Sequence, residues 1–117
     1  MAKAEIRLGE GEGSGGIKET LTIVTGSTAT AFKEDATTLS VTSNFATQTA
    51  SMNAFLEYFS VSFVQGTGWS YTAKKSGRFR LYYSPTGTEV DVTKNANEVI
   101  TTHAGFTTGQ YAVMSVY

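Results

Sequence analysis

Residues 55–83, FLEYFSVSFVQGTGWSYTAKKSGRFRLYY, decide the fold that the sequence predicts. Apolar and polar residues alternate over residues 59–63, and this period of two is typical of a half-buried strand. Glycine-containing turns follow at residues 65–68 and 76–77, because glycine tolerates the positive φ angles of turns. We therefore predict two or three strands joined by tight turns, with the Lys-Lys-Ser-Gly segment as a hairpin tip.

Outside this stretch, the same alternation predicts further strands in residues 17–25, 28–33, 37–42, 88–92, 98–102 and 110–117. Residues 43–49 are predicted to form a loop. Residues 51–57 are the best helix candidate, because Ser51 can cap and apolar residues recur there at helical spacing. A strand that continues directly into Tyr58 is the alternative. The regular spacing of short strands predicts a mainly β fold, a small antiparallel β-sandwich or barrel with at most one short helix.

The composition of the 117-residue chain supports this fold class and excludes several functions. Charged residues make up 16%, against about 25% in ordinary globular proteins, and 19 Thr and 11 Ser replace them. Threonine is β-branched and favours strands. The absence of cysteine excludes disulfides and thiolate chemistry. A net charge of −1 provides no overall attraction to nucleic acid or acidic membranes, and no apolar run is long enough for a membrane span.

The start of the chain is predicted to be a flexible arm. Residues 9–16 read GEGEGSGG, which is too polar and too rich in glycine to pack. We therefore predict a Gly/Glu-rich N-terminal arm over residues 1–16 and a single β domain over residues 17–117. The arm contains a formal G-x-G-x-x-G match, but the strand before it and the helix after it that a dinucleotide site requires are missing.

No catalytic or metal-binding motif is found. A Ser-His-Asp arrangement would need His103, the single histidine, which lies in a Thr/Gly-rich segment and is expected to be an exposed or hydrogen-bonded loop residue. The acidic residues are scattered singly, without the spacing of a calcium loop or of paired catalytic carboxylates. We therefore predict a protein that is not an enzyme, with no catalytic residues, metal or cofactor and no signal peptide.

A candidate partner-binding surface combines aromatic and basic residues of the central stretch: Trp69, Tyr71, Lys74, Lys75, Arg78, Arg80 and Tyr82. Aromatic faces stack on bases while cations follow phosphates, so this composition suits single-stranded nucleic acid, and a tryptophan can also stack on a sugar ring of a glycan. The alternative is structural, because lysines at a hairpin tip serve solubility and block strand pairing, and a single tryptophan is commonly a core residue. The near-neutral total charge makes nucleic acid a less favoured partner than a protein.

The hexapeptide Lys-Ser-Gly-Arg-Phe-Arg at residues 75–80 resembles a Lys-Ser-Gly-x-Phe-Arg turn in the lambda-type head decoration proteins of tailed phages. The chain is also similar to them in its size, its lack of cysteine and its apolar C-terminal strand. Members of that family are small β-rich proteins that sit as trimers on the capsid and carry an N-terminal arm that orders on the shell. The resemblance implies a non-enzymatic structural protein of a phage-like virion, most simply a capsid decoration subunit. Its expected partners are a capsid or other virion protein and copies of itself, with a trimer favoured.

Overall fold

The computed structural model describes residues 16–24, 28–34, 37–42 and 45–117, which form two antiparallel sheets and one helix. The large sheet has the order β4-β3-β2-β10-β7-β8, with the bounds β2 (Glu19–Val24), β3 (Ala29–Lys33), β4 (Thr38–Val41), β7 (Gly77–Tyr83), β8 (Thr88–Lys94) and β10 (Tyr111–Val116). The small sheet has the order β5-β6-β9, and the helix is α1, with the bounds β5 (Phe59–Val64), β6 (Gly68–Ala73), β9 (Val99–His103) and α1 (Phe45–Phe55).

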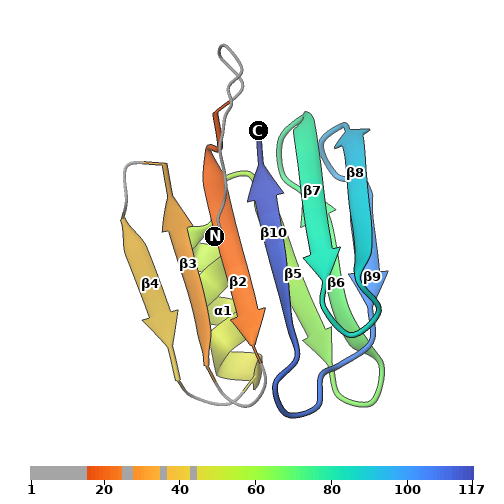
Figure 1. The fold of residues 1–117 in the computed structure, drawn as a ribbon. Coiled ribbons are helices and arrows are strands. Elements are labelled where there is room, and N and C mark those ends of the chain that lie inside the picture. Colours follow the sequence, from red (N-terminus) through yellow and green to blue (C-terminus); the bar gives the residue numbers. More distant parts are fainter. Residues whose placement is uncertain (1–15, 25–27, 35–36, 43–44) are drawn as a thin grey trace.

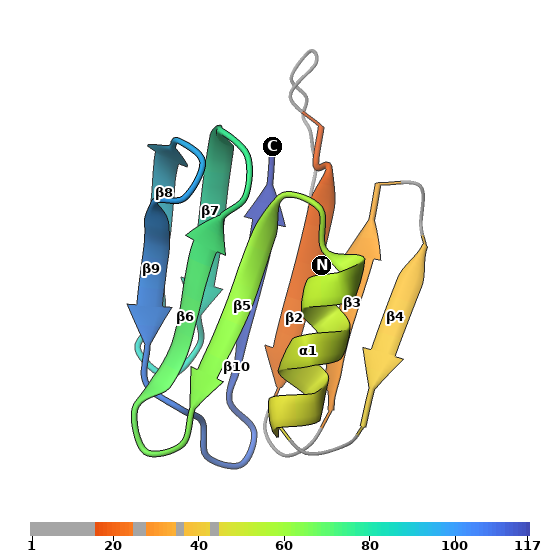
Figure 2. The same ribbon diagram turned by 180° about the vertical axis from the view of Figure 1, so that it is seen from behind.

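The molecule is a sandwich in which one layer is shared by a sheet and a helix. The small sheet and α1 lie side by side behind the large sheet, as Figures 1 and 2 show from opposite sides. The helix contacts β3 and β4 of the large sheet and β5 of the small one. The predicted mainly β fold with antiparallel strands and one helix is therefore confirmed. Residues 1–15 of the predicted arm lie outside the described residues.

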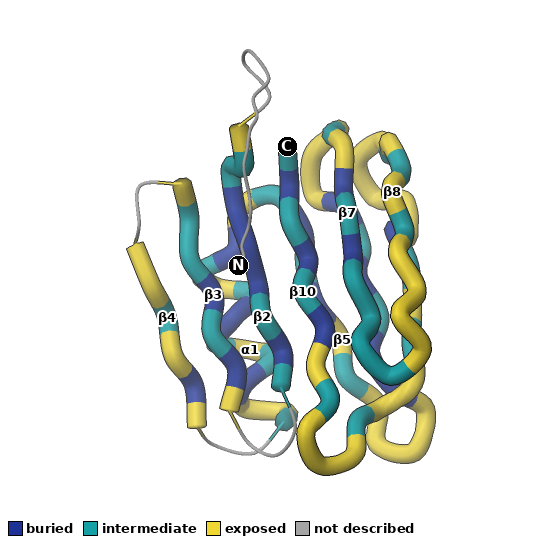
Figure 3. The backbone as a smooth tube through the Cα atoms, viewed as in Figure 1, coloured by how far each residue is buried: buried dark blue, intermediate teal, exposed yellow. Residues whose placement is uncertain are grey.

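The core lies between the two layers and follows the predicted alternation. In β10, Ala112, Met114 and Val116 are buried while the residues between them point outward. In β7, Phe79 and Leu81 are buried in the same way. Figure 3 shows this alternation as dark blue segments along the central strands of the large sheet. These strands therefore present one apolar face to the core and one polar face to the outside.

The helix differs from its prediction. It begins at Phe45 rather than at Ser51, so the predicted loop over residues 43–49 is wrong from Phe45 onward. The first turn is supported by tertiary packing, because the Phe45 ring lies 4.5 Å from the ring of Phe63 and 5.7 Å from that of Trp69. Such contacts stabilise a short helix whose intrinsic propensity is low. The alternative of a continuous strand is also wrong, since β5 begins at Phe59.

The segment between β6 and β7 is not a hairpin tip, although the sequence predicted one. β6 belongs to the small sheet and β7 to the large sheet, so residues 74–76 carry the chain from one layer to the other. Residues 84–87, by contrast, form the turn of a hairpin that joins β7 and β8, and the Gly87 amide donates to the Tyr83 carbonyl at 2.9 Å. Gly87 has a φ of 71°, which is why glycine suits the exit of this turn.

Both ends of the described chain lie at one end of the sandwich. The Lys18 amide donates to the Val116 carbonyl at 2.7 Å, and Figure 1 shows the start of β2 beside the end of β10. Among the described residues, no helix is both long enough and apolar enough to cross a membrane.

Candidate interaction surface

Lys74, the first of the four predicted basic site residues, closes the end of the helix. Its Nζ donates to the carbonyl of Leu56 at 2.5 Å and to that of Asn53 at 3.2 Å. The last carbonyls of a helix have no partner within the helix, and a lysine near its C-terminus satisfies them and complements the helix dipole. Lys74 therefore holds α1 against the crossing between the sheets.

Lys75 is held in an ion pair beside the same helix end. Its Nζ lies 2.9 Å from Oε2 of Glu57, and Lys33 reaches Oε1 of this carboxylate at 3.2 Å. Hydrogen bonds from Lys75 and Lys33 hold the pKa of Glu57 below its ordinary value. One carboxylate thus links β3, the end of α1 and the crossing segment.

The two predicted arginines are paired across neighbouring strands of the large sheet. Arg78 on β7 donates two hydrogen bonds to the carboxylate of Asp91 on β8, from Nε at 2.9 Å and from Nη2 at 2.7 Å. Arg80 donates to Glu89 at 2.8 Å. The bond from Arg78 lowers the pKa of Asp91. Each arginine therefore has a carboxylate beside it, so the pairs carry no net charge.

The predicted aromatic members of the site are divided between core and surface. Trp69 is 1% exposed and Tyr71 is 0% exposed, so neither presents a face to a partner. The indole packs against the rings of Phe45 and Phe63 inside the sandwich. Tyr82 alone points outward, on the large sheet. The structure therefore does not bring the seven predicted residues together, and the interpretation of Trp69 as a stacking platform is corrected to a core residue.

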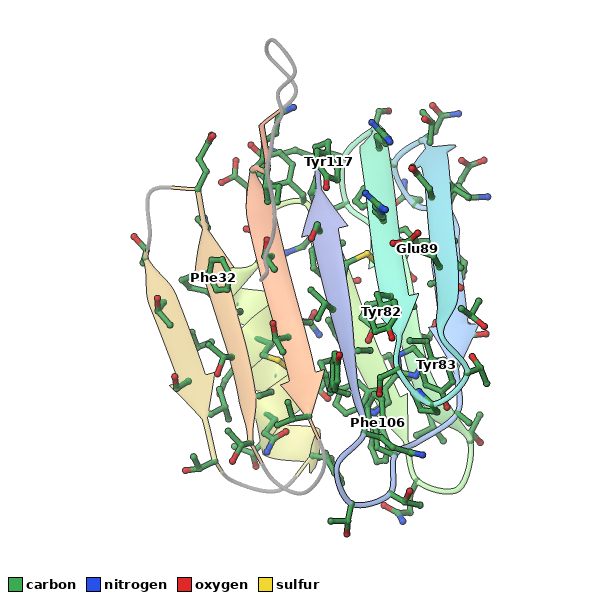
Figure 4. All side chains as sticks on the ribbon, in the orientation of Figure 1. Phe32, Tyr82, Tyr83, Glu89, Phe106 and Tyr117 are labelled. Carbon is green, nitrogen blue, oxygen red and sulfur yellow. The ribbon has the colours of Figure 1, made fainter. Side chains whose placement is uncertain are left out.

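The largest candidate surface is instead the outer face of the large sheet, here called the broad face. It consists of outward-pointing side chains from β2, β3, β7, β8 and β10 together with the last residue: Thr22, Thr30, Phe32, Arg78, Arg80, Tyr82, Glu89, Asp91, Tyr111, Val113, Ser115 and Tyr117. Phe32 and Tyr82 are labelled on this side in Figure 4. None of the described elements covers it, since α1 and the small sheet lie behind (Figure 2).

The broad face is uncharged overall and carries aromatic rings among its hydroxyl groups. Its centre is a row in which Thr22 lies between Thr30 and Val113. The rings of Tyr82 and Tyr111 pack 5.9 Å apart, and the Arg78 guanidinium lies 5.1 Å from the centre of the Tyr117 ring. Its charged side chains are the two pairs of arginine and carboxylate. Such a surface can pack against another protein without leaving a buried charge unpaired.

His103 lies at the end of β9 rather than in a loop. Its Nε2 is 2.8 Å from the Tyr71 hydroxyl, and its Nδ1 is 2.8 Å from the Ala104 carbonyl. Burial lowers the pKa of the imidazole. The strands approach closely here, because a Cβ on Gly68 would lie 2.2 Å from the His103 carbonyl oxygen. Both ring nitrogens therefore serve hydrogen bonds within the fold.

A shallow depression of about 320 Å³ opens beside this histidine on the small sheet. Its polar lining consists mainly of hydroxyl groups, and His103 is the one titratable side chain among its residues: Ser62, Val64, Thr67, Gly68, Trp69, Ser70, Thr102, His103 and Ala104. Within the described part of the chain, no three His, Asp or Glu side chains lie close enough to hold a metal ion.

Comparison with known proteins adds no relative: no family model, curated protein or solved structure matches the chain. The candidate surface consequently depends on the geometry alone. Sequence reasoning missed it because its residues come from five strands and the C-terminus, and only the strand order brings them side by side. The available signal was the threonine-rich alternation of residues 20–24 and 28–33, whose outward positions Thr22, Thr30 and Phe32 belong to the broad face.

Proposed function

We propose that this protein is a non-enzymatic structural subunit of a phage-like particle, which attaches to the particle and to copies of itself through the broad face. The observation that carries the proposal is the composition of that face, which is rich in aromatic rings and has its arginines paired with carboxylates. In this role the protein works by burying surface, and no bond is made or broken.

The chemistry of the broad face supports a protein partner. Interface cores are depleted of charge and enriched in aromatic residues, and the four rings of Phe32, Tyr82, Tyr111 and Tyr117 fit that composition. A nucleic-acid surface instead needs cations that are free to replace counterions at phosphates. Here Arg78 and Arg80 are already paired with carboxylates.

The virion setting is supported by the resemblance of residues 75–80 to a turn of the lambda-type decoration proteins, and by the hydroxyl-rich, cysteine-free composition. A particle with many equivalent sites also suits such a protein, since a closed ring of identical subunits, such as a trimer, binds with a higher avidity than one subunit with the same weak contact.

The test is binding of the purified protein to empty shells of the parent particle, measured by co-sedimentation. Thr22→Arg places an unpaired charge at the centre of the broad face, and we expect about a tenfold or greater loss of binding. Thr72→Arg is the matched control, because Thr72 is a half-buried threonine in the middle of β6 that points outward on the opposite sheet. Equal binding by both variants would refute attachment through the broad face.

A sizing column with light scattering, run with and without a dT oligonucleotide, tests whether the protein associates with copies of itself and whether it binds nucleic acid in the absence of particles. We expect an oligomer whose mass is unchanged by the oligonucleotide. Co-elution that is lost as salt rises would instead favour a nucleic-acid module and would contradict the proposal.

A further inference from the structure

The large sheet ends in a strand that offers a free hydrogen-bonding edge. β8 pairs with β7 on one side and is the last strand of the sheet. The Ser84 amide donates a hydrogen bond to Tyr111, and the Arg78 carbonyl accepts one from the Tyr117 amide. The even-numbered residues of β7 therefore form their backbone hydrogen bonds with β10 and its flanks, and the odd-numbered ones form theirs with β8. It follows from the register that Glu89, Asp91 and Thr93 direct their N–H and C=O groups away from the sheet.

The inner side of this edge is apolar and open. Val90 and Val92 point toward the core but are only half buried. The neighbouring edge strand, β9, carries Val99, whose residue surface is 52% exposed. Figure 3 shows most of β8 as exposed, at the side of the sandwich where both sheets end.

The opposite side of the sandwich is closed by the helix. There Asn53 of α1 uses its side-chain amide like a strand, accepting from the Val61 amide at 2.6 Å and donating to the Val61 carbonyl at 2.7 Å. The backbone groups of Val61 at the edge of β5 are thereby satisfied. No described element does the same for β8, so an additional extended segment would complete the fold at this side.

The chain contains a segment with the pattern that this edge needs. Residues 2–8 read AKAEIRL, in which apolar residues alternate strictly with charged ones. The segment has seven residues, the same length as β8. It is joined to the domain by the glycine-rich residues 9–16, which permit long reach in many directions.

We propose that residues 2–8 of one copy add as an antiparallel strand to β8 of a second copy. With residues 2–8 opposite residues 88–94, the apolar side chains would cover Val90 and Val92, Arg7 would lie opposite Glu89, and Glu5 would lie opposite Asp91. Arg78 and Arg80 of β7 already pair with Asp91 and Glu89, so Arg7 adds a second cation beside Glu89 and Glu5 meets a carboxylate that is already neutralised. This strand addition between two copies does not depend on the proposed virion role.

The strand directions favour a second copy over the same chain. Three successive antiparallel pairings make β8 antiparallel to β2, so a strand antiparallel to β8 would end at the far end of β2. Its end is then about 20 Å along and about 19 Å across from the start of β2. The Lys18 amide bonds to the Val116 carbonyl, so the chain continues past the start of β2, and the separation from Lys18 is about 30 Å. Residues 8–18 span at most about 36 Å, so bridging this separation within one chain requires them to be almost fully extended. Within one chain a parallel strand needs no such extension, but parallel pairing is the less stable arrangement.

Amide hydrogen exchange of the isotope-labelled full-length protein tests whether residues 2–8 of one copy add to β8 of another. At high protein concentration, we expect the amides of Glu89, Asp91 and Thr93 to exchange about tenfold more slowly than at low concentration. Ile6→Asp, which breaks the apolar side of the segment, should abolish this protection. Glu5→Gln, on the charged side, is the matched control and should retain it.

A block on the receiving strand gives a second readout. Thr93→Pro removes an amide that points away from β7, a position where an edge strand tolerates proline. Light scattering should show a lower mass for this variant at the concentration where the unchanged protein associates. Protection that is the same at all concentrations would mean pairing within one chain and would overturn the proposal. Fast exchange of the three amides under all conditions would overturn it as well.

Discussion

The hydroxyl of Tyr71 and the Nε2 atom of His103 lie 2.8 Å apart inside the sandwich, and the partners of the two ring nitrogens together determine the tautomer of the imidazole. The other ring nitrogen, Nδ1, is 2.8 Å from the carbonyl oxygen of Ala104, which can only accept. Nδ1 therefore carries the proton, and Nε2 accepts from Tyr71. The rings of Tyr83 and Phe106 lie 4.8 Å and 5.2 Å from the imidazole and shield it. These contacts therefore stabilise the neutral form of His103.

This arrangement predicts a loss of stability in mild acid. Burial lowers the pKa of His103 below its ordinary value of 6.5, so the unfolded chain takes up the proton at a higher pH than the folded one. The free energy of unfolding should therefore fall as the pH drops below about 6.5, and this contribution should level off below the folded-state pKa. Urea unfolding at a series of pH values measures it.

The control is His103→Gln, in which the side chain cannot titrate. The variant is less stable at neutral pH, but the part of the pH dependence that begins near 6.5 should be absent. If both proteins lose the same stability over that interval, another group is responsible and the assignment to His103 is wrong.

Glu19 is a buried carboxylate that predicts a different pattern. It is 0% exposed and accepts from the Glu57 amide at 3.1 Å and from the Tyr58 amide at 3.4 Å. Glu19→Ala leaves these donors without their acceptor, so we expect a loss of about 1–3 kcal/mol in the free energy of unfolding. Thermal or urea denaturation at neutral pH provides the value.

Glu19→Gln is the conservative comparison, since it keeps one acceptor oxygen and should lose less than the alanine variant. Burial raises the pKa of Glu19 above 4.5, so in the unchanged protein its stabilising effect is complete below pH 4.5 and is lost as the pH rises through the folded-state value. The glutamine variant should lack this rise on acidification. A rise of equal size in both proteins would contradict the assignment.

Two adjacent lysines give the third prediction. Lys74→Met removes the donor at the C-terminus of α1, and we expect a loss of about 1 kcal/mol in the free energy of unfolding. Lys75→Met removes a solvent-exposed ion pair with Glu57 and should cause no measurable change. Equal effects in urea unfolding would show that the bonds from Lys74 to the helix carbonyls do not stabilise the helix end.

The sequence predicts individual strands well but does not determine how they associate. Alternation identifies β5, β7 and β10 because one side chain in two must be buried. A short turn, however, joins strands equally well within a sheet and between sheets. The segment at residues 74–76 was therefore predicted as a hairpin tip, whereas it crosses between the layers.

The helix and the candidate site were harder to predict for related reasons. α1 buries Gln48, a polar residue, where a helical pattern would have an apolar one, so its first turn resembled a loop. The burial of Trp69 could not be predicted from its own segment of the sequence. It depends on contacts with Phe45 and Phe63, which form only in the folded chain. The broad face likewise exists only once the strand order is known.

The hydrogen bond between the Lys18 amide and the Val116 carbonyl has a consequence for protein engineering. Because the first described strand starts where the last one ends, a short peptide can join the two without crossing the molecule. New termini opened in the exposed turn at residues 84–87 would then lie at the far end of β7 and β8. A circular permutant of this kind would display a fused cargo at the pole opposite to the two ends of the described chain.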